Sequence, residues 1–104
     1  MTFISKGRGD PVVFVHGALT DARMWERHLD IVAGARFRAI AVTLSHHGTA
    51  PWTDDLRAYG LPTHVAELID FVERLAAGPV HLVGWSYGAD AAISVAVERP
   101  DLVR

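Results

Sequence analysis

The sequence predicts an α/β fold in which a parallel sheet is flanked by helices in a three-layer α/β/α arrangement. Three observations predict it. Apolar runs of strand length alternate three times with segments of helical spacing. The run at 12–15 is continuously apolar, as in a strand that is buried on both faces of a sheet, and the run at 37–42 has similar buried character. Glycine and proline separate most of the segments. Such alternation indicates right-handed βαβ units and a parallel sheet.

The first unit begins with the apolar run 12–15, Val-Val-Phe-Val, which we expect to form a buried strand. Asp21 is placed to cap the helix that follows, and Gly34 to close it. That helix is predicted by apolar residues at positions i, i+4 and i+7, namely Trp25, Leu29 and Val32.

The second unit contains a strand at 37–42 and then a polar loop at 45–51. Pro62 stands where the first turn of a helix tolerates proline, and Gly78-Pro79 stops that helix. Its apolar stripe has helical spacing and consists of Val65, Leu68, Ile69 and Val72.

The third unit contains a strand at 80–83, a turn flanked by glycines and a helix at 89–97. Alanines on this helix allow it to approach the sheet closely. Pro100 ends the helix, and residues 101–104 resemble the lead-in to another strand. We therefore expect residues 1–104 to be one part of a single domain.

Composition restricts the class of protein. Half of the residues are apolar and 21% are charged, which is typical of a globular chain. The net charge of −2 gives no reason to expect a nucleic-acid partner, and the absence of cysteine excludes disulfides and thiolate chemistry. No uninterrupted apolar stretch suggests a signal peptide or a membrane span, so we expect a cytoplasmic protein. No dinucleotide or Walker glycine loop follows the first strand, so we expect no nucleotide cofactor.

The strongest local signal is Gly84-Trp85-Ser86-Tyr87-Gly88, a G-x-S-x-G pattern between a predicted strand and a predicted helix. A chain that turns from strand to helix at Ser86 needs a positive φ there. Side chains two positions on either side would clash, which explains Gly84 and Gly88. The pattern predicts an exposed serine hydroxyl at the start of a helix, where the helix dipole favours negative charge. The alternative is a tight turn with an incidental serine.

Three segments in order resemble the α/β-hydrolase family: His16-Gly17-Ala18-Leu19, the loop 43–50 and the strand 79–84 that leads to the glycine-flanked serine. The loop departs from the family's usual D-x-x-G-x-G-x-S, since Thr43 replaces the acid and His46 the first glycine. The resemblance covers nearly the whole chain. It implies an incomplete α/β-hydrolase fold, of which this chain is the N-terminal part.

The resemblance also implies roles for individual residues. Ser86 would be the catalytic nucleophile, and the backbone N–H groups of Ala18 and Tyr87 would form the oxyanion hole. The side chain of His16 would support its loop rather than act as an acid or base. In this family the acid and then the histidine follow the serine on later strands, so we expect little turnover from these 104 residues alone.

All six histidines precede Ser86. His47 lies in a loop at the same sheet edge, so it remains a candidate in-chain base, although the geometry would be unlike the family's. A metal site at His46-His47 is disfavoured because adjacent side chains diverge and no carboxylate or cysteine stands at ligand spacing. We expect His28 and His64 on helix surfaces and His81 as a hydrogen-bonded, partly buried strand residue. Asp90 is expected to be an ordinary helix residue.

These observations favour a serine hydrolase that acts on a small-molecule ester or related acyl substrate. The alternative is a truncated, non-catalytic remnant or binding module. Related folds perform carbon–carbon hydrolysis and cofactor-free haloperoxidation on the same serine, whereas the haloalkane and epoxide branches use aspartate. We also expect poor solubility or self-association, because the strand before Ser86 would form an exposed sheet edge.

Overall fold

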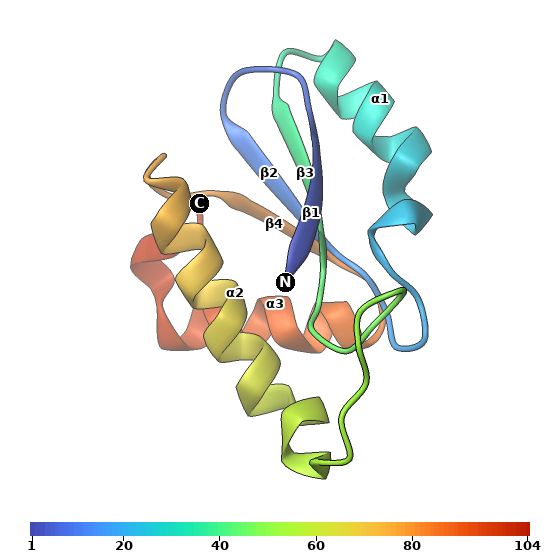
Figure 1. Cartoon of the computed structure of the whole chain (residues 1–104). Coiled ribbons are helices and arrows are strands. Elements are labelled where there is room, and N and C mark those ends of the chain that lie inside the picture. The colour runs from blue at the N-terminus through green and yellow to red at the C-terminus, as the bar shows by residue number, and fades with distance from the viewer.

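The computed structural model describes all 104 residues and has one four-stranded sheet with helices on both faces (Figure 1). The strands are β1 (Thr2–Lys6), β2 (Pro11–Val15), β3 (Arg38–Thr43) and β4 (His81–Gly84). The α-helices are α1 (Glu26–Gly34), α2 (Leu61–Leu75) and α3 (Tyr87–Glu98). Short 3-10 helices span Ala22–Trp25, Leu56–Tyr59 and Pro100–Leu102. The predicted alternation and the three layers are confirmed.

The sheet has the order β1-β3-β2-β4, and its last three strands are parallel. Val13 of β2 stands between Ile40 of β3 and Leu82 of β4. The predicted parallel sheet is confirmed for β2, β3 and β4, and β1, which was not predicted, adds an edge strand that runs antiparallel to β3. The connection from β1 to β2 is only the turn 7–10, which reverses the chain, whereas a parallel crossover needs a dozen or more residues.

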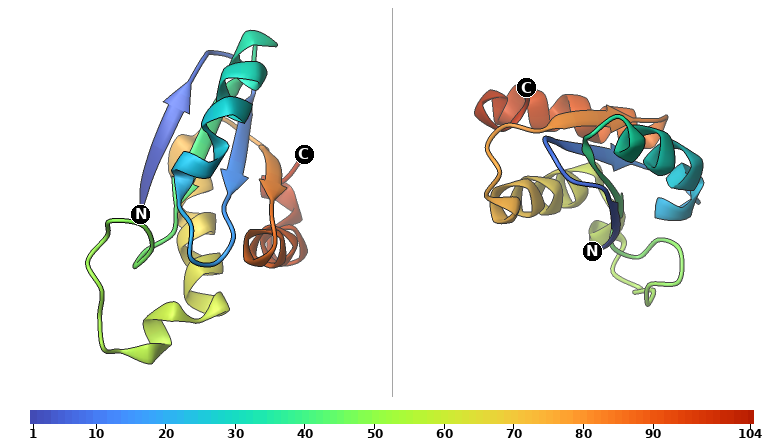
Figure 2. Two further views of the ribbon diagram at one scale, coloured as in Figure 1. Left: turned by 90° about the vertical axis from the view of Figure 1, so that its right-hand side faces the viewer. Right: turned by 90° about the horizontal axis from the view of Figure 1, so that it is seen from above.

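The two faces of the sheet carry separate apolar clusters because successive strand side chains point to opposite sides. Val13 and Val15 face α2 and α3, in a cluster of 11 buried residues. Val12 and Phe14 face α1 and the 3-10 helix before it, in a cluster of 7 buried residues. Figure 2 shows α1 on one face and the other two α-helices on the opposite one. Burial on both faces explains the apolar character of β2 and β3, whereas the edge strand β4 is only partly buried.

The β4 edge of the sheet is only partly covered. A single parallel bridge joins Val80 to Val103, directly after the 3-10 helix Pro100–Leu102, and the lead-in to another strand stays a prediction. Next to Val83, which is 37% exposed, an apolar groove of about 330 Å³ runs between β4 and α1. Its lining includes Val12, Phe14, Ile31, Val32 and Phe37. Self-association through this edge stays a prediction.

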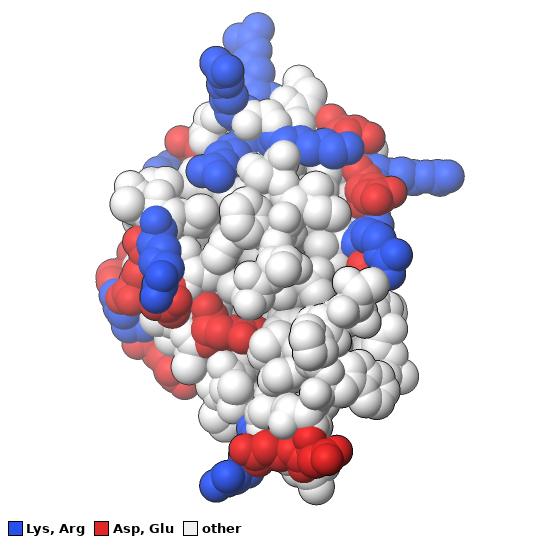
Figure 3. Space-filling view, in the orientation of Figure 1, with Lys and Arg blue, Asp and Glu red and all other residues white.

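Charged side chains lie mainly around the outline of the molecule in Figure 3, and the middle of this face is largely uncharged. Ion pairs such as Lys6–Asp30, at 2.7 Å, join exposed groups and therefore contribute little to stability. No helix combines the length and the apolar character that a membrane crossing requires.

Candidate active site

The connection from β4 to α3 has the geometry that the glycine-flanked serine predicts. Ser86 is the residue that precedes α3, and its backbone has φ 54° and ψ −123°. A positive φ at a residue other than glycine is strained, and it turns the side chain out of the strand-to-helix corner. Ser86 is exposed, at the N-terminal end of α3. The predicted positive φ is confirmed.

The flanking glycines are required by close backbone contacts. A Cβ atom at Gly84 would overlap the carbonyl of Gly88, four residues ahead. A Cβ atom at Gly88 would overlap the carbonyl oxygens of Val15 and His16. The contacts of Gly88 press the turn directly against the carboxyl end of β2. The sequence predicts that neither position has room for a side chain, but not this contact with β2.

The loop after β2 lies beside this turn. The N–H of Trp85 donates to the carbonyl of Val15 at 3.2 Å, and a Cβ atom at Gly17 would lie 2.6 Å from the Trp85 ring. The N–H groups of Ala18 and Tyr87 take part in none of the loop and cap hydrogen bonds. The first N–H groups of a helix have no partner within the helix. Two backbone donors thus stay available on adjacent segments next to Ser86.

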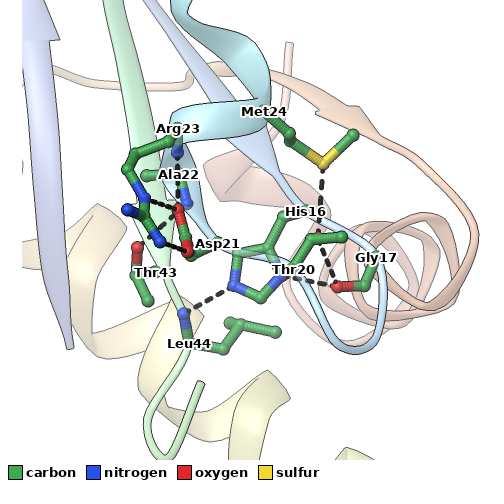
Figure 4. Close-up of polar contacts among 9 residues, drawn as sticks. All are labelled: His16, Gly17, Thr20, Asp21, Ala22, Arg23, Met24, Thr43 and Leu44. Atoms are coloured by element: carbon green, nitrogen blue, oxygen red, sulfur yellow. Dashed lines mark hydrogen bonds and ion pairs between the residues drawn. The ribbon is translucent and has the colours of Figure 1, made fainter. Parts of the chain in front are cut away.

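His16 supports this loop, as the sequence analysis expects. Its imidazole is fully buried, and its Nε2 accepts a hydrogen bond from the N–H of Leu44 at 3.0 Å (Figure 4). A nitrogen that accepts from an N–H carries no proton, so the proton is on Nδ1, which donates to the carbonyl of Gly17 at 2.7 Å. Burial lowers the pKa of His16 and keeps the ring neutral. The ring joins the loop after β2 to the end of β3.

The loop after β3 is held by side chains where the family pattern is broken. The hydroxyl of Thr43 accepts the N–H of Ala22 at 3.0 Å (Figure 4). His46 has φ 61°, a conformation that favours glycine, and its Nδ1 lies 2.8 Å from the carbonyl oxygen of Pro51. The N–H of Ser45 donates to the carboxylate of Glu67 at 2.9 Å.

Asp21 closes the other side of this loop. Its carboxylate accepts the N–H of Arg23 as the predicted cap, here of a 3-10 helix, and also pairs with the Arg23 guanidinium. The hydrogen bond from the Arg23 side chain holds the pKa of Asp21 at about 2. A Cβ atom at Gly48 would lie 2.9 Å from that of Asp21, so the loop passes directly over the carboxylate.

The expectation that His64 lies on a helix surface is wrong. Its side chain is fully buried, because His64, Leu68 and Val72 follow one another at i, i+4 and i+8 along the inward stripe of α2. The Nδ1 atom of His64 lies 2.6 Å from the hydroxyl of Tyr87, and Nε2 lies 3.3 Å from the carbonyl oxygen of Ser45. Burial lowers the pKa of His64 and raises that of the Tyr87 phenol. Sequence reasoning missed this contact.

His47 packs among other rings instead of reaching Ser86. Its ring centroid lies 5.1 Å from that of His16 and 5.3 Å from that of His64, and its Nδ1 lies 3.0 Å from the Ser45 carbonyl oxygen. No hydrogen bond joins it to Ser86, so no observed contact supports His47 as the base. No group of three or more His, Asp or Glu side chains is arranged to hold a metal ion.

The other polar residues have simpler surroundings. His28 is exposed, as expected. His81 is partly buried as expected, but its ring packs in a T-shaped arrangement with the ring of Phe37, and no hydrogen bond is observed. Asp90 is exposed on the first turn of α3, as expected for an ordinary helix residue.

The serine does not line the cavity that opens beside the start of β1. A cavity of about 630 Å³ opens between the start of β1 and the loop 43–51, and Ser86 does not line it. Two apolar side chains on the turn and on the loop after β2 are exposed: Trp85, directly before Ser86, is 53% exposed, and Leu19 is 98% exposed, with φ 63°. The serine therefore stands on an open surface of this chain.

Comparison with known proteins supports the resemblance. A sequence model of the Alpha/beta hydrolase family matches residues 12–103. An epoxide hydrolase of Caballeronia sordidicola is 33% identical over 97 residues, which cover 92% of this chain and 29% of that protein. An esterase of Mycobacterium tuberculosis is also 33% identical over 97 residues, covering 93% of this chain and 31% of the esterase.

A solved structure matches closely in shape. The crystal structure of an epoxide hydrolase from Vigna radiata has a TM-score of 0.92 at 24% identity, and the match covers 97% of this chain and 33% of that one. This likeness shows the fold. The chain spans about a third of the length of the curated relatives it matches.

Proposed function

The chain belongs to the alpha/beta hydrolase family, and on that premise we propose that it carries the nucleophile of a serine hydrolase that cleaves an ester or a related acyl bond. The observation that carries the proposal is the backbone of Ser86, with φ 54° at the start of α3 between two glycines that have no room for a side chain. Residues held in strained conformations by the surrounding structure cluster at active sites.

In the proposed reaction the Ser86 oxygen attacks the acyl carbon and gives up its proton to a base. The carbonyl oxygen becomes an oxyanion, for which the N–H groups of Ala18 and Tyr87 are the proposed donors. The leaving group departs with a proton, and water then hydrolyses the acyl-serine ester. The base is the missing component, because no side chain of this chain is hydrogen-bonded to the Ser86 hydroxyl.

The chemistry of serine favours an acyl substrate over an epoxide, although two of the matched proteins are epoxide hydrolases. A serine oxygen that opened an epoxide would form an ether, which water does not cleave under mild conditions. A carboxylate nucleophile forms an ester instead, which water can hydrolyse. Ser86 therefore favours ester hydrolysis, and the similarity to the esterase of Mycobacterium tuberculosis supports the same proposal.

Phosphonylation of Ser86 tests the proposal. We expect a fluorophosphonate to form a bond between the Ser86 oxygen and phosphorus with loss of fluoride, as located by mass spectrometry. The rate should be low and should rise about tenfold with added imidazole, since an exogenous base replaces the missing one. Ser86→Ala should abolish the label, and Ser94→Ala, on the same helix, should keep it. Labelling that is equal at other serines would instead favour the non-catalytic alternative.

The reading frame downstream of the Arg104 codon gives an independent check. An Asp or Glu followed by a late His on further predicted strands would support a complete serine hydrolase.

A further inference from the structure

We propose that His64 is a positioning residue of this site, which holds Tyr87, and with it the backbone N–H that follows Ser86, against the end of β3. The inference rests on the proposed function, because it assigns His64 to one of the two oxyanion donors. His64 is a buried histidine of α2 that lies 22 positions before Ser86 in the sequence and takes no part in the proposed reaction itself.

The hydrogen bonds of His64 define its protonation state. The carbonyl oxygen of Ser45 can only accept, so Nε2 of His64 carries the proton and donates to it at 3.3 Å. Nδ1 is then an acceptor, and the phenol of Tyr87 donates to it at 2.6 Å. One neutral imidazole therefore connects Tyr87, the residue after the nucleophile, to Ser45, the second residue after β3.

His16 makes the matching connection on the other half of the site. It joins the carbonyl of Gly17, the residue before Ala18, to the N–H of Leu44. The segments that carry the two proposed donors are thus attached, each through one buried imidazole, to the adjacent residues Leu44 and Ser45. This pair of residues fixes the two donor segments relative to each other.

Glu67 makes that common anchor rigid. It lies one turn after His64 on α2 and accepts the N–H of Ser45 at 2.9 Å, while His64 binds the carbonyl of the same residue. Both polar groups of the Ser45 backbone are thereby held by α2. Moving Tyr87 away from Ser45 would require breaking the bond to His64.

The surroundings keep His64 neutral. Burial, which lowers its pKa, is the largest effect and is aided by His47 and His46, whereas Glu67 and the Ser45 carbonyl act in the opposite direction. On α3, Tyr87 faces the ring, and burial raises the pKa of its phenol. The phenol therefore keeps its proton and the imidazole keeps an open lone pair at neutral pH, which preserves the hydrogen bond.

Two substitutions of similar size separate the hydrogen bonds from packing. His64→Leu fills the space but makes neither bond, while the carboxamide of His64→Gln can donate to Ser45 and accept from Tyr87. We expect Leu to slow fluorophosphonate labelling of Ser86 about tenfold, because small displacements of catalytic groups are costly. Gln should restore the rate to within about threefold of wild type. His28→Gln, at an exposed position of α1, should leave the rate unchanged.

Tyr87→Phe provides a readout that does not depend on folding of the Leu variant, since it removes only the hydroxyl. We expect the ¹⁵N resonance of His64 Nδ1 to move and amide exchange at position 87 to become faster, together with slower labelling. The proposal is overturned if Tyr87→Phe leaves both the His64 resonance and the labelling rate unchanged. It is also overturned if His64→Leu lowers the melting temperature while the folded protein is labelled at the wild-type rate.

Failure of the proposed function would look different. Wild-type protein would then show no label at Ser86 even with imidazole, while the resonance and exchange measurements on Tyr87→Phe would still report whether His64 holds this residue.

Discussion

The turn after β4 and the loop after β3 each hold a strained residue in place, but with different kinds of contact. Each follows a parallel strand at the same edge of the sheet, and each holds a residue other than glycine at positive φ, Ser86 at 54° and His46 at 61°. At Ser86 the strain is held by backbone packed on backbone through Gly84 and Gly88. At His46 it is held by side chains: the imidazole lies 2.8 Å from the Pro51 carbonyl oxygen and packs on the ring of Tyr59.

This difference in contacts determines how each segment responds to a substitution. A turn held by backbone contact has no flexible atom that can move aside, so an added methyl group displaces a whole strand or helix. A loop held by side-chain hydrogen bonds loses one bond at a time, and each of those bonds depends on the identity of one residue.

The largest effect is expected at Gly88, where the comparison is sharpest. Gly88→Ala places a methyl group against the carbonyls of Val15 and His16, so we expect the free energy of unfolding to fall by about 3 kcal/mol. Urea denaturation measures it. The matched control is Gly34→Ala, at the end of α1, where no atom lies within 4 Å of the new Cβ. This change should leave stability unaltered or raise it by up to about 1 kcal/mol. Equal effects of the two changes would refute the close packing.

An intermediate effect is expected at His16, whose side chain is hydrogen-bonded to Leu44 directly after β3. His16→Leu leaves the buried N–H of Leu44 without an acceptor, and we expect this to cost about 2 kcal/mol. Urea denaturation at pH 7.5 gives this value directly. His16→Gln keeps an acceptor and should cost less.

The protonation of His16 adds a pH dependence. Burial places the pKa of His16 below the ordinary value of 6.5, so the unfolded chain takes up its proton first as the pH falls. The stabilisation is therefore complete above pH 6.5 and is lost as the pH drops through the lower folded-state pKa. Between pH 7.5 and 5, the stability of wild type should fall more steeply than that of His16→Gln. Parallel profiles for the two proteins would contradict this assignment.

The same difference explains what could be predicted from the sequence. The turn at Ser86 was predictable because its determinants are local: Gly84 and Gly88 stand two positions before and after the serine. Strands β2 and β3 were predictable because burial on both faces gives runs rich in apolar residues. Strand β4 is only partly buried, and it was predictable from its position directly before the glycine-flanked turn. In contrast, β1 was missed, since an exposed edge strand with the polar residues Ser5 and Lys6 has no such pattern.

The side-chain contacts that join distant segments could not be predicted. His64 stands at helical spacing with Leu68 and Val72, which could have indicated burial, but nothing local identifies the Tyr87 hydroxyl as its partner. The pairing of His16 with Leu44 likewise depends on the register of β2 against β3. Such contacts follow from the assembled fold, where segments far apart in sequence meet.

The smallest effects are expected from substitutions that relieve the backbone strain at Ser86 and at His46. They compare the turn held by backbone packing directly with the loop held by side chains. Ser86→Gly removes the unfavourable Cβ at positive φ, and the lost hydroxyl has no hydrogen-bond partner in the chain. We therefore expect the unfolding free energy to rise by up to about 1 kcal/mol, while labelling at position 86 disappears. His46→Gly relieves similar strain but also loses the contacts with Pro51 and Tyr59, so its stability should stay within about 0.5 kcal/mol of wild type. Parallel urea titrations compare the two. If Ser86→Gly were the more destabilising change, the strain at the turn would not be a cost retained for reactivity, and the serine would have to be treated as a structural residue.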